Sequence, residues 1–252
     1  MTREKATAKY AFPIRRNQIK NRTLIPKYYD PVLTQDILAE EKKWEAPWVS
    51  LHDLVNEGML SAETGIEIGK MAYGTGQIPF IRTSDIADLE VKADPRQGIS
   101  KAIFDAAGAK GVVEEGDVLV VRDGTYLVGS SAIVTNTDTP ALISGGLYRL
   151  RSLAPKKLDP NALLGLLNLP IVRRQMRARQ FTRDVIDTLG YRLFEVRIPN
   201  PMSKEAKNIG RKLGAILTSK FSLRDRIGVA VSQLEPVVPT KSRNRPGWSM
   251  RG

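Results

Sequence analysis

The chain contains 252 residues, 42% of them hydrophobic, which is enough for one large domain with a core of its own and excludes a wholly disordered protein. The absence of cysteine and the presence of a single histidine, His52, exclude disulfides, structural zinc sites, cysteine nucleophiles and multi-histidine metal centres. The formal net charge of +12 favours a polyanionic partner, because neutralised phosphates release counterions, although solvated lysine and arginine faces produce the same excess.

Residues 1–30 form a basic first segment, with eight basic and two acidic residues. They show no sustained apolar period, so we expect an N-terminal arm or linker. The first ten residues lack the apolar stretch of a secretory signal. No run in the chain approaches the ~20 apolar residues that span a bilayer. We therefore expect a cytoplasmic protein without a membrane partner.

Two short helices are predicted after the arm. Residues 31–45 place apolar side chains among charged ones in a loosely helical pattern, and Pro47 ends it. A second short helix begins near Leu51 and runs through Val55. Glycines then punctuate residues 58–76, which is typical of turns between strand-length pieces.

Residues 77–153 alternate short apolar runs with Gly, Asp and Pro, as expected of short strands. The runs are residues 78–82, 111–124, 126–134 and 141–152. Parallel βαβ units would need longer helical crossovers between such strands. The pattern therefore predicts an α/β (α+β) fold with a compact, twisted or barrel-like, mainly antiparallel sheet.

The chain changes character after Pro155. Asp159 and Pro160 have the residue types of a helix N-cap and of the first helical position, and a helical period continues to Gly190, with a break or kink at Pro170. Residues 191–201 are then expected to form one more strand, and residues 203–231 a final amphipathic helix. The basic tail, residues 236–252, is expected to be disordered.

One group of polar side chains follows the apolar run at 78–82. Arg82, Thr83 and Ser84 enter a loop directly after that strand, and Arg, Ser and Thr are residue types that read base edges or hold phosphates. A strand that ends in an ordinary polar turn has the same composition. We predict these three residues as readers of DNA bases.

A second group lies at the tip of a predicted hairpin over residues 114–129, in which Asp123-Gly124 supplies the turn. Turn chemistry accounts for this Asp-Gly pair, but it does not require the types of Arg122, Thr125 and Tyr126. Because binding residues concentrate on loops, we predict that these three residues also read bases.

The predicted helix after Pro170 is rich in arginine. Residues 173 and 177 lie on one face by their i, i+4 spacing, and arginine makes fork-shaped contacts with phosphate oxygens. A solvated face or a face that docks a partner is the alternative. The predicted phosphate contacts are Lys101, Arg173, Arg174, Arg177 and Arg179.

These segments, in this order, resemble one target recognition domain of the specificity subunits of type I restriction-modification systems. The resemblance covers residues 49–217 and rests on GQIPFIRTSDI, GDVLVVRDGTYLVG, the apolar and then arginine-rich helix, and FEVRIPNP. It implies an α/β domain that reads half of a split DNA sequence, followed by a helix that docks methyltransferase subunits.

Members of that family usually carry two such domains and two long spacer helices, whereas this chain has length for one domain and a short final helix. The family's glutamine after the proline pair is replaced by Glu205. Residues 21–31 resemble the junction at which such a domain follows a fused adenine methyltransferase. A second basic stripe, predicted to dock a partner subunit, consists of Lys204, Lys207, Arg211 and Lys212.

Catalysis is not expected from this chain. The Asn/Asp-Pro-Pro-aromatic tetrapeptide and the Gly-rich methyl-donor loop of adenine methyltransferases are both absent from the sequence, and we expect no cofactor and no metal.

The predicted organisation is an arm over 1–30, a recognition domain over 31–201, a helix over 202–235 and a tail over 236–252.

The predicted function is a double-stranded DNA-binding specificity subunit of a prokaryotic, nucleoid-associated complex. Its expected partners are DNA, a methyltransferase subunit, a restriction subunit, and a second copy that reads the other half of a split site. The alternative is an adaptor of a DNA-defence complex that mainly docks proteins. RNA binding is disfavoured, because aromatic content of 6% shows no stacking pair on a sheet.

Overall fold

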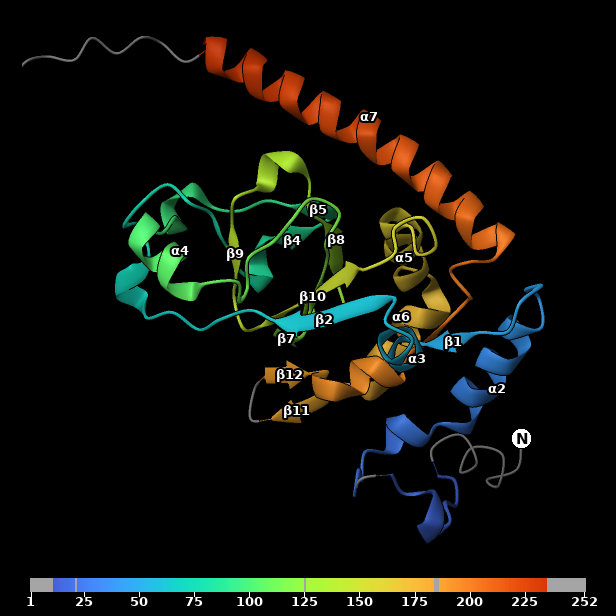
Figure 1. The fold of residues 1–252 in the computed structure, drawn as a ribbon. Coiled ribbons are helices and arrows are strands. Elements are labelled where there is room, and N and C mark those ends of the chain that lie inside the picture. The colour runs from blue at the N-terminus through green and yellow to red at the C-terminus, as the bar shows by residue number, and fades with distance from the viewer. Residues whose placement is uncertain (1–10, 21, 125, 184–185, 235–252) are drawn as a thin grey trace, which may run out of the picture. The chain divides into compact units, whose positions relative to one another are not determined.

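The computed structural model describes residues 11–20, 22–124, 126–183 and 186–234. The chain forms two units, residues 1–213 and 214–252. The first unit contains all the strands and all but the C-terminal part of the last helix (Figure 1).

A six-stranded mixed sheet is the centre of the first unit. Its order is β2 (Leu60–Thr64), β10 (Leu147–Ser152), β6 (Val118–Val121), β8 (Ser131–Ile133), β5 (Leu89–Val91) and β4 (Ile86–Ala87). Only β5 and β8 run parallel; the other neighbours are antiparallel. The expected α/β class and mainly antiparallel sheet are confirmed.

Strand β6 is buried on both of its faces. Leu119 and Val121 point into an apolar cluster with residues of β8, β9 (Leu142–Ile143) and β10. Val118 and Val120 point to the opposite face, which also carries Ser131 and is covered by helix α5 (Pro160–Leu167). A strand covered on both sides has no solvent face to leave polar, and this explains its continuous apolar run.

Three smaller sheets surround the large one. Their strands are β3 (Phe80–Ile81) with β9 (Leu142–Ile143), β1 (Val49–Ser50) with β13 (Arg197–Ile198), and β11 (Phe181–Arg183) with β12 (Ile186–Thr188) and β7 (Asp123–Gly124). The β3–β9 pair is parallel, and it packs in a second apolar cluster with Phe104 of α4 (Lys101–Ala107).

Three helices begin at capping side chains, of which the sequence analysis predicted Asp159. Asp30 caps α2 (Pro31–Glu41), Ser50 caps α3 (Leu51–Asn56) and Asp159 caps α5 (Pro160–Leu167). Short 3-10 turns occupy Arg16–Gln18, Pro26–Tyr29, Lys70–Ala72, Thr83–Asp85, Pro95–Gln97, Asn136–Asp138 and Gly190–Glu195. The last of these is η7.

The helix expected over residues 159–189 is shorter and divided. Pro170 takes the first position of a new helix, α6 (Pro170–Arg179), so the chain breaks there rather than kinking. The expectation of helix beyond Arg179 was wrong, because Gln180 is extended and Phe181–Arg183 pairs antiparallel with Ile186–Thr188; we call these two strands the β11–β12 hairpin. The β-branched Thr182, Ile186 and Thr188 favour this conformation.

Two strand expectations also need correction. Residues 191–201 form the turn η7 and only the two-residue strand β13. In the predicted hairpin, the strand that returns along β6 is β8 at 131–133, preceded by Gly129, whose N–H donates to the Val121 carbonyl oxygen at 2.8 Å; residues 126–128 do not belong to it. Asp123-Gly124 is not its tight turn: these residues form β7 and pair with β12.

Helix α7 (Lys204–Leu234) is 31 residues long. The final helix expected over residues 203–231 is thus confirmed, whereas the expectation that it would be short was wrong. Its first part packs closely on α5: a Cβ placed on Gly210 would lie 2.9 Å from the Cβ of Ala162. The predicted tail at 236–252 lies outside the described residues. In the described part of the chain, no helix is long and apolar enough to cross a membrane.

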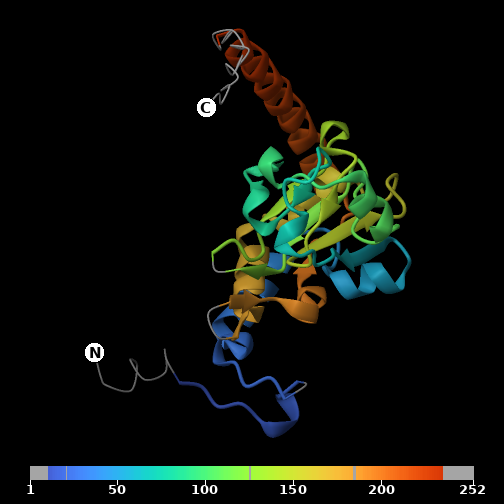
Figure 2. The same cartoon turned by 90° about the vertical axis from the view of Figure 1, so that its left-hand side faces the viewer.

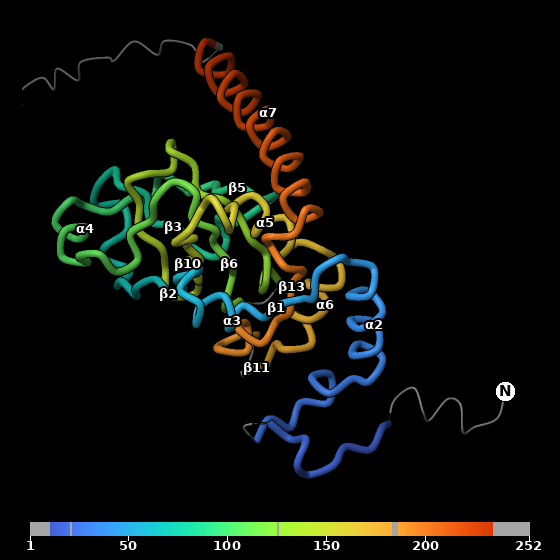
Figure 3. The backbone as a smooth tube through the Cα atoms, turned by 45° about the vertical axis from the view of Figure 1, so that its right-hand side comes forward, coloured from blue at the N-terminus to red at the C-terminus, as the bar shows by residue number. Residues whose placement is uncertain are grey.

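Gln175 joins α6 to β13 through two hydrogen bonds. Its side chain is fully buried; Nε2 donates to the Arg197 carbonyl oxygen at 2.8 Å, and Oε1 accepts from the Arg197 N–H at 2.9 Å. The amide therefore continues the β1–β13 pairing onto α6. Figure 3 shows the backbone of α6 beside β1 and β13.

We expect Gln175→Met to lower the free energy of unfolding by about 3 kcal/mol, because two backbone groups of Arg197 lose their partner while side-chain volume is conserved. Gln35→Met on the exposed side of α2 is the matched control and should change stability by less than about 0.5 kcal/mol. Denaturant unfolding of both variants tests this, and equal stability would contradict the assigned role of Gln175.

Candidate nucleic-acid interface

The two loops that carry the predicted base-reading residues approach each other at Gly146. The backbone N–H groups of Arg122 and Asp123 both donate to its carbonyl oxygen, at 2.8 and 3.2 Å. A Cβ added to Gly146 would lie 2.7 Å from Cγ2 of Thr83. The loop after β3 and the loop after β6 therefore approach each other where Gly146 leaves room.

Arg82 is held in the first of these loops by Asp85. Its Nε and Nη2 donate to the Asp85 carboxylate at 3.3 and 3.1 Å, and its backbone N–H donates to the same group at 2.9 Å. Asp85 is buried and Arg82 is partly exposed. Ser84 is exposed and donates to Asp85 at 3.2 Å, whereas Thr83 is half-buried.

Arg122 has a fixed guanidinium in the second loop. Nη2 and Nε lie 2.5 and 2.7 Å from Oδ2 of Asp123, and the guanidinium carbon lies 5.8 Å from the centre of the Tyr148 ring. Burial disfavours the charged form of Arg122, but the hydrogen bond and ion pair with Asp123 outweigh it and raise its pKa. The side chain is 30% exposed, so part of it faces solvent.

The tip of this loop carries Tyr126, which is 94% exposed. Thr125 lies outside the described residues. The structure thus brings Thr83 and Arg122 together around Gly146, with Arg82 and Ser84 in the same turn as Thr83. Their reading of bases stays a prediction.

The β11–β12 hairpin adds a third segment to this surface. Asp187 pairs with Gly124 and Thr188 pairs with Asp123, and the Leu189 N–H donates to the Arg122 carbonyl oxygen at 3.0 Å. Figure 1 shows the hairpin beside β7, at the edge of the six-stranded sheet.

Arg192 fastens the hairpin to the end of α6. Its Nε donates to the carbonyl oxygen of Arg179 at 2.8 Å and its Nη2 to that of Thr188 at 3.1 Å. Its guanidinium also lies 5.7 Å from the ring centre of Phe181. Sequence reasoning missed this residue, because it assigned residues 181–189 to a helix.

Two of the predicted phosphate contacts are used inside the domain. Arg173 donates to the Gly129 carbonyl oxygen and, at 3.4 Å, to Ser130 Oγ. Arg179 donates to the Gln175 carbonyl oxygen at 3.2 Å, and its guanidinium lies 5.7 Å from the Tyr28 ring centre. Burial lowers the pKa of both, with nearby Arg177 adding to the effect on Arg173. This geometry favours a structural role for the pair.

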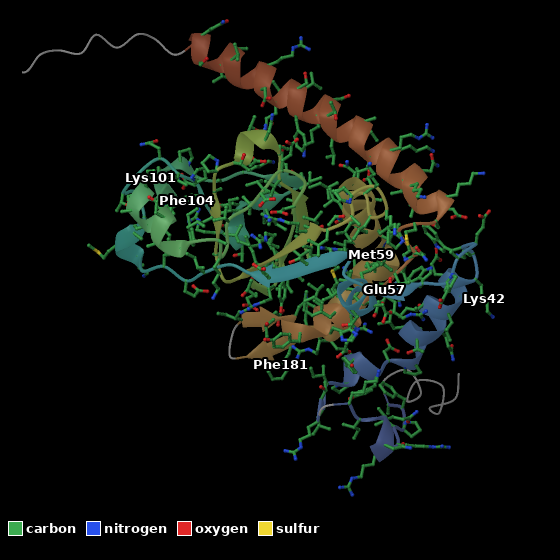
Figure 4. All side chains as sticks on the ribbon, in the orientation of Figure 1. Lys42, Glu57, Met59, Lys101, Phe104 and Phe181 are labelled. Atoms are coloured by element: carbon green, nitrogen blue, oxygen red, sulfur yellow. The ribbon has the colours of Figure 1, made fainter. Side chains whose placement is uncertain are left out.

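The other three predicted phosphate contacts are exposed, but they lie on two helices and do not form one cluster. Arg177 is exposed on α6, and Arg174 forms an ion pair with Asp36 of α2 at 2.8 Å. Lys101 pairs with Asp105 on α4 at 2.7 Å, and Figure 4 shows it well apart from Phe181 of the hairpin. The five residues therefore do not form one continuous basic face.

The predicted docking stripe on α7 is partly assembled. Lys204, Lys207 and Arg211 line a shallow groove of about 600 Å³ together with Glu45, Glu205 and Asn208. Lys212 is exposed but does not line this groove. Among the described residues, no group of three or more His, Cys, Asp or Glu side chains could hold a metal ion.

The end of the N-terminal segment contacts the domain. The Tyr28 hydroxyl donates to Glu195 Oε2 of η7, and Figures 1 and 2 both place this segment (blue) beside residues 170–198 (orange). Burial and the neighbouring Glu195 carboxylate raise the pKa of Tyr28 well above its usual value near 10. The segment expected to be an arm therefore docks at Tyr28.

The comparisons with known proteins identify the fold. No protein-family model and no curated protein matches the sequence. The S subunit of a type I restriction-modification system from M. genitalium aligns over 73% of this chain and 43% of its own, with 16% identity and a TM-score of 0.51. The chain has the fold of a target recognition domain. That expectation from the sequence is confirmed.

Two further solved structures are similar. The HsdS subunit from Thermoanaerobacter tengcongensis aligns over 77% of this chain and 45% of its own, with 24% identity and a TM-score of 0.46. A structure that describes complex assembly and conformational transition of the type I restriction-modification system aligns over 81% of this chain and 48% of its own. The identity is 19% and the TM-score is 0.47. The chain spans less than half the length of each of the three.

We expect Tyr28→Phe to lower stability by about 1 kcal/mol at neutral pH, because Glu195 loses a hydrogen-bond donor. Because the pKa of Tyr28 is raised in the folded protein, the Tyr28 hydroxyl ionises in the unfolded chain at a lower pH, near 10, than in the folded protein. The wild-type advantage is therefore complete below pH 10 and shrinks above it.

Unfolding measured at several pH values tests this, with Tyr73→Phe as the control, since the Tyr73 ring packs on Phe80 in another part of the domain. A wild-type advantage that grows above pH 10 would contradict the assigned contact.

Proposed function

We propose that the protein is a non-catalytic specificity subunit that binds a defined double-stranded DNA sequence and directs an adenine methyltransferase or restriction complex to it. The observation that carries the proposal is the meeting of Thr83 with the backbone of Arg122 and Asp123 at Gly146. The fold shared with a type I S subunit supports it by analogy. Catalysis then belongs to partner subunits, and the complex is cytoplasmic and nucleoid-associated.

Arg122 is the strongest candidate base reader. Guanine presents two acceptors in the major groove, which the fork of an arginine matches. Asp123 engages Nε and Nη2, so it fixes the orientation of the guanidinium and leaves other N–H donors for a base. We assign base reading to Arg82, Thr83, Ser84, Thr125 and Tyr126 as well.

Contacts with the phosphates of the DNA backbone would come from exposed arginine side chains. We assign them to Arg174 and Arg177 of α6, while Lys204, Lys207 and Arg211 of the α7 groove dock a methyltransferase subunit. In this proposal residues 31–201 are the recognition domain and residues 202–235 the docking helix.

Selection from a randomised duplex pool tests the function. The purified protein, alone and with its methyltransferase subunit, is incubated with the pool at two salt concentrations, and the retained DNA is sequenced. A short motif enriched at the higher salt is the expected result. Motif-free retention that vanishes with salt would overturn base reading, because phosphate attraction alone behaves in that way.

We expect Arg122→Ala to relax specificity at one base position by ~1–3 kcal/mol, and Arg177→Ala to weaken all sequences alike and to flatten the salt dependence. Arg96→Ala is the matched control, because Arg96 is also an exposed arginine paired with a neighbouring aspartate, at 3.1 Å. Titration of the selected duplex and of single-base variants measures all three. Uniform loss with Arg122→Ala would contradict base reading by this residue.

The second unit offers a surface for a protein partner. Ile216, Leu223 and Ile227 follow the 7- and 4-residue spacing of one helix face and are 64, 53 and 62% exposed. We propose that this face pairs with the same face of a second copy, which would let two recognition domains read the halves of a split site. The exposed apolar face of α7 is also the observation that favours the alternative function, an adaptor that mainly docks proteins.

We expect Leu223→Glu combined with Ile227→Glu to convert dimers to monomers in sedimentation experiments, because a charge in an apolar helix seam is left unpaired. Thr218→Glu with Ser222→Glu, on the opposite face of α7, is the control and should remain dimeric. A monomeric wild-type protein over the micromolar range would contradict the pairing.

A further inference from the structure

Large apolar side chains are exposed on the three segments that the β7–β12 pairing joins. Tyr126 is 94% exposed, Tyr191 86%, Ile186 50% and Phe181 44%. They come from the loop after β6, from η7 and from the β11–β12 hairpin. Single exposed apolar residues are ordinary, but several on adjoining segments mark a binding surface.

The hairpin presents part of this surface on one side. Phe181 pairs with Thr188 and residue 183 with Ile186, so Phe181 and Ile186 belong to the same face of the ribbon, since successive side chains alternate. Thr182 and Asp187 are on the other face, where the Thr182 hydroxyl donates to the Asp187 carboxylate at 2.6 Å.

The base of this ribbon is held firmly. Arg192 bonds to backbone oxygens of α6 and β12 and lies over the Phe181 ring. The ring of Phe194 contacts that of Tyr148 edge-on, at 5.5 Å between centroids, and Tyr148 lies beneath Arg122. The segments that carry the exposed apolar side chains are therefore anchored to the same part of the domain as Arg122.

We propose that the apolar rim, defined as Tyr126, Phe181, Ile186 and Tyr191, enters the major groove and reads thymine by contact with its 5-methyl group. A major groove admits a two-stranded ribbon, and apolar side chains distinguish thymine by that methyl group. Arg122, on the loop after β6 that also carries Tyr126, supplies the polar contact. This inference rests on the proposed function and adds Phe181, Ile186 and Tyr191 to the base-reading residues predicted from the sequence motifs.

Uracil substitution tests the rim directly, because deoxyuridine differs from thymidine only by the missing methyl group. In the duplex motif obtained by selection, each thymine is replaced singly by uracil, and binding is measured for the wild type, Ile186→Ala, Tyr191→Ala and Arg122→Ala. Met71→Ala is the control, because Met71 is 91% exposed and lies in the 3-10 turn at residues 70–72.

We expect at least one uracil to weaken wild-type binding about fourfold, the change that corresponds to one buried methyl group. The same uracil should have no further effect on Ile186→Ala or on Tyr191→Ala. It should still weaken Met71→Ala and Arg122→Ala, because neither removes the apolar contact. Thermal unfolding confirms that each variant is folded.

Three results would overturn the inference. Motif-specific, Arg122-dependent binding that no uracil changes would refute the rim while the proposed function stands. Rim variants that keep uracil sensitivity but lose the methyltransferase subunit would assign the surface to protein docking. Failure of the wild type to select any motif would refute the proposed function and the rim together.

Discussion

The pairing of β7 with β12 is the constraint on which the candidate interface depends. Two backbone register pairs, Asp187 with Gly124 and Thr188 with Asp123, join segments more than 60 positions apart in the chain. Without this pairing, no backbone hydrogen bonds would join β7, which follows Arg122, to the β11–β12 hairpin. With it, the loop that carries Arg122 and Tyr126 is joined directly to the β11–β12 hairpin.

This pairing in turn requires that α6 be held where it is. Gln175 ties the helix to β13, and Arg173 ties it to the loop after β6 through Gly129. The hairpin starts directly after α6, so its position is set by these contacts. Tyr28 adds a contact to η7 from the N-terminal segment. The arginines of α6 thus work partly as packing groups.

Residues 31–150 contain 18 acidic and 10 basic residues, and several of the acidic side chains form ion pairs with arginine. Arg82 is paired with Asp85 and Arg122 with Asp123, while on β10 Arg149 pairs with Glu63 at 2.6 Å and Arg151 with Asp117 at 2.7 Å. In a partly buried site such a pair fixes the direction of the guanidinium. The net charge of a segment is therefore a weak guide to what its arginines can bind.

Local chemistry made several features predictable. Helix caps at Asp30, Ser50 and Asp159 and the apolar run of β6 were readable because each depends on neighbouring residues. The hairpin at 181–188 was not, because its strands are short and need β7 from a distant segment to complete their sheet.

Composition also could not separate Arg173 and Arg179, which bond to backbone inside the domain, from the exposed Arg177. All three have the same residue type and the same helical context in the sequence. The signal that could have revealed the hairpin was the β-branched spacing of Thr182, Ile186 and Thr188.

Hydrogen exchange of the protein with and without its selected duplex tests the central claim most directly. If the surface joined by β7 and β12 binds DNA, amides of residues 122–128 and 181–192 should gain protection together, while those of α4 stay unchanged. Protection confined to α7, or gained by only one of the two joined segments, would contradict the account.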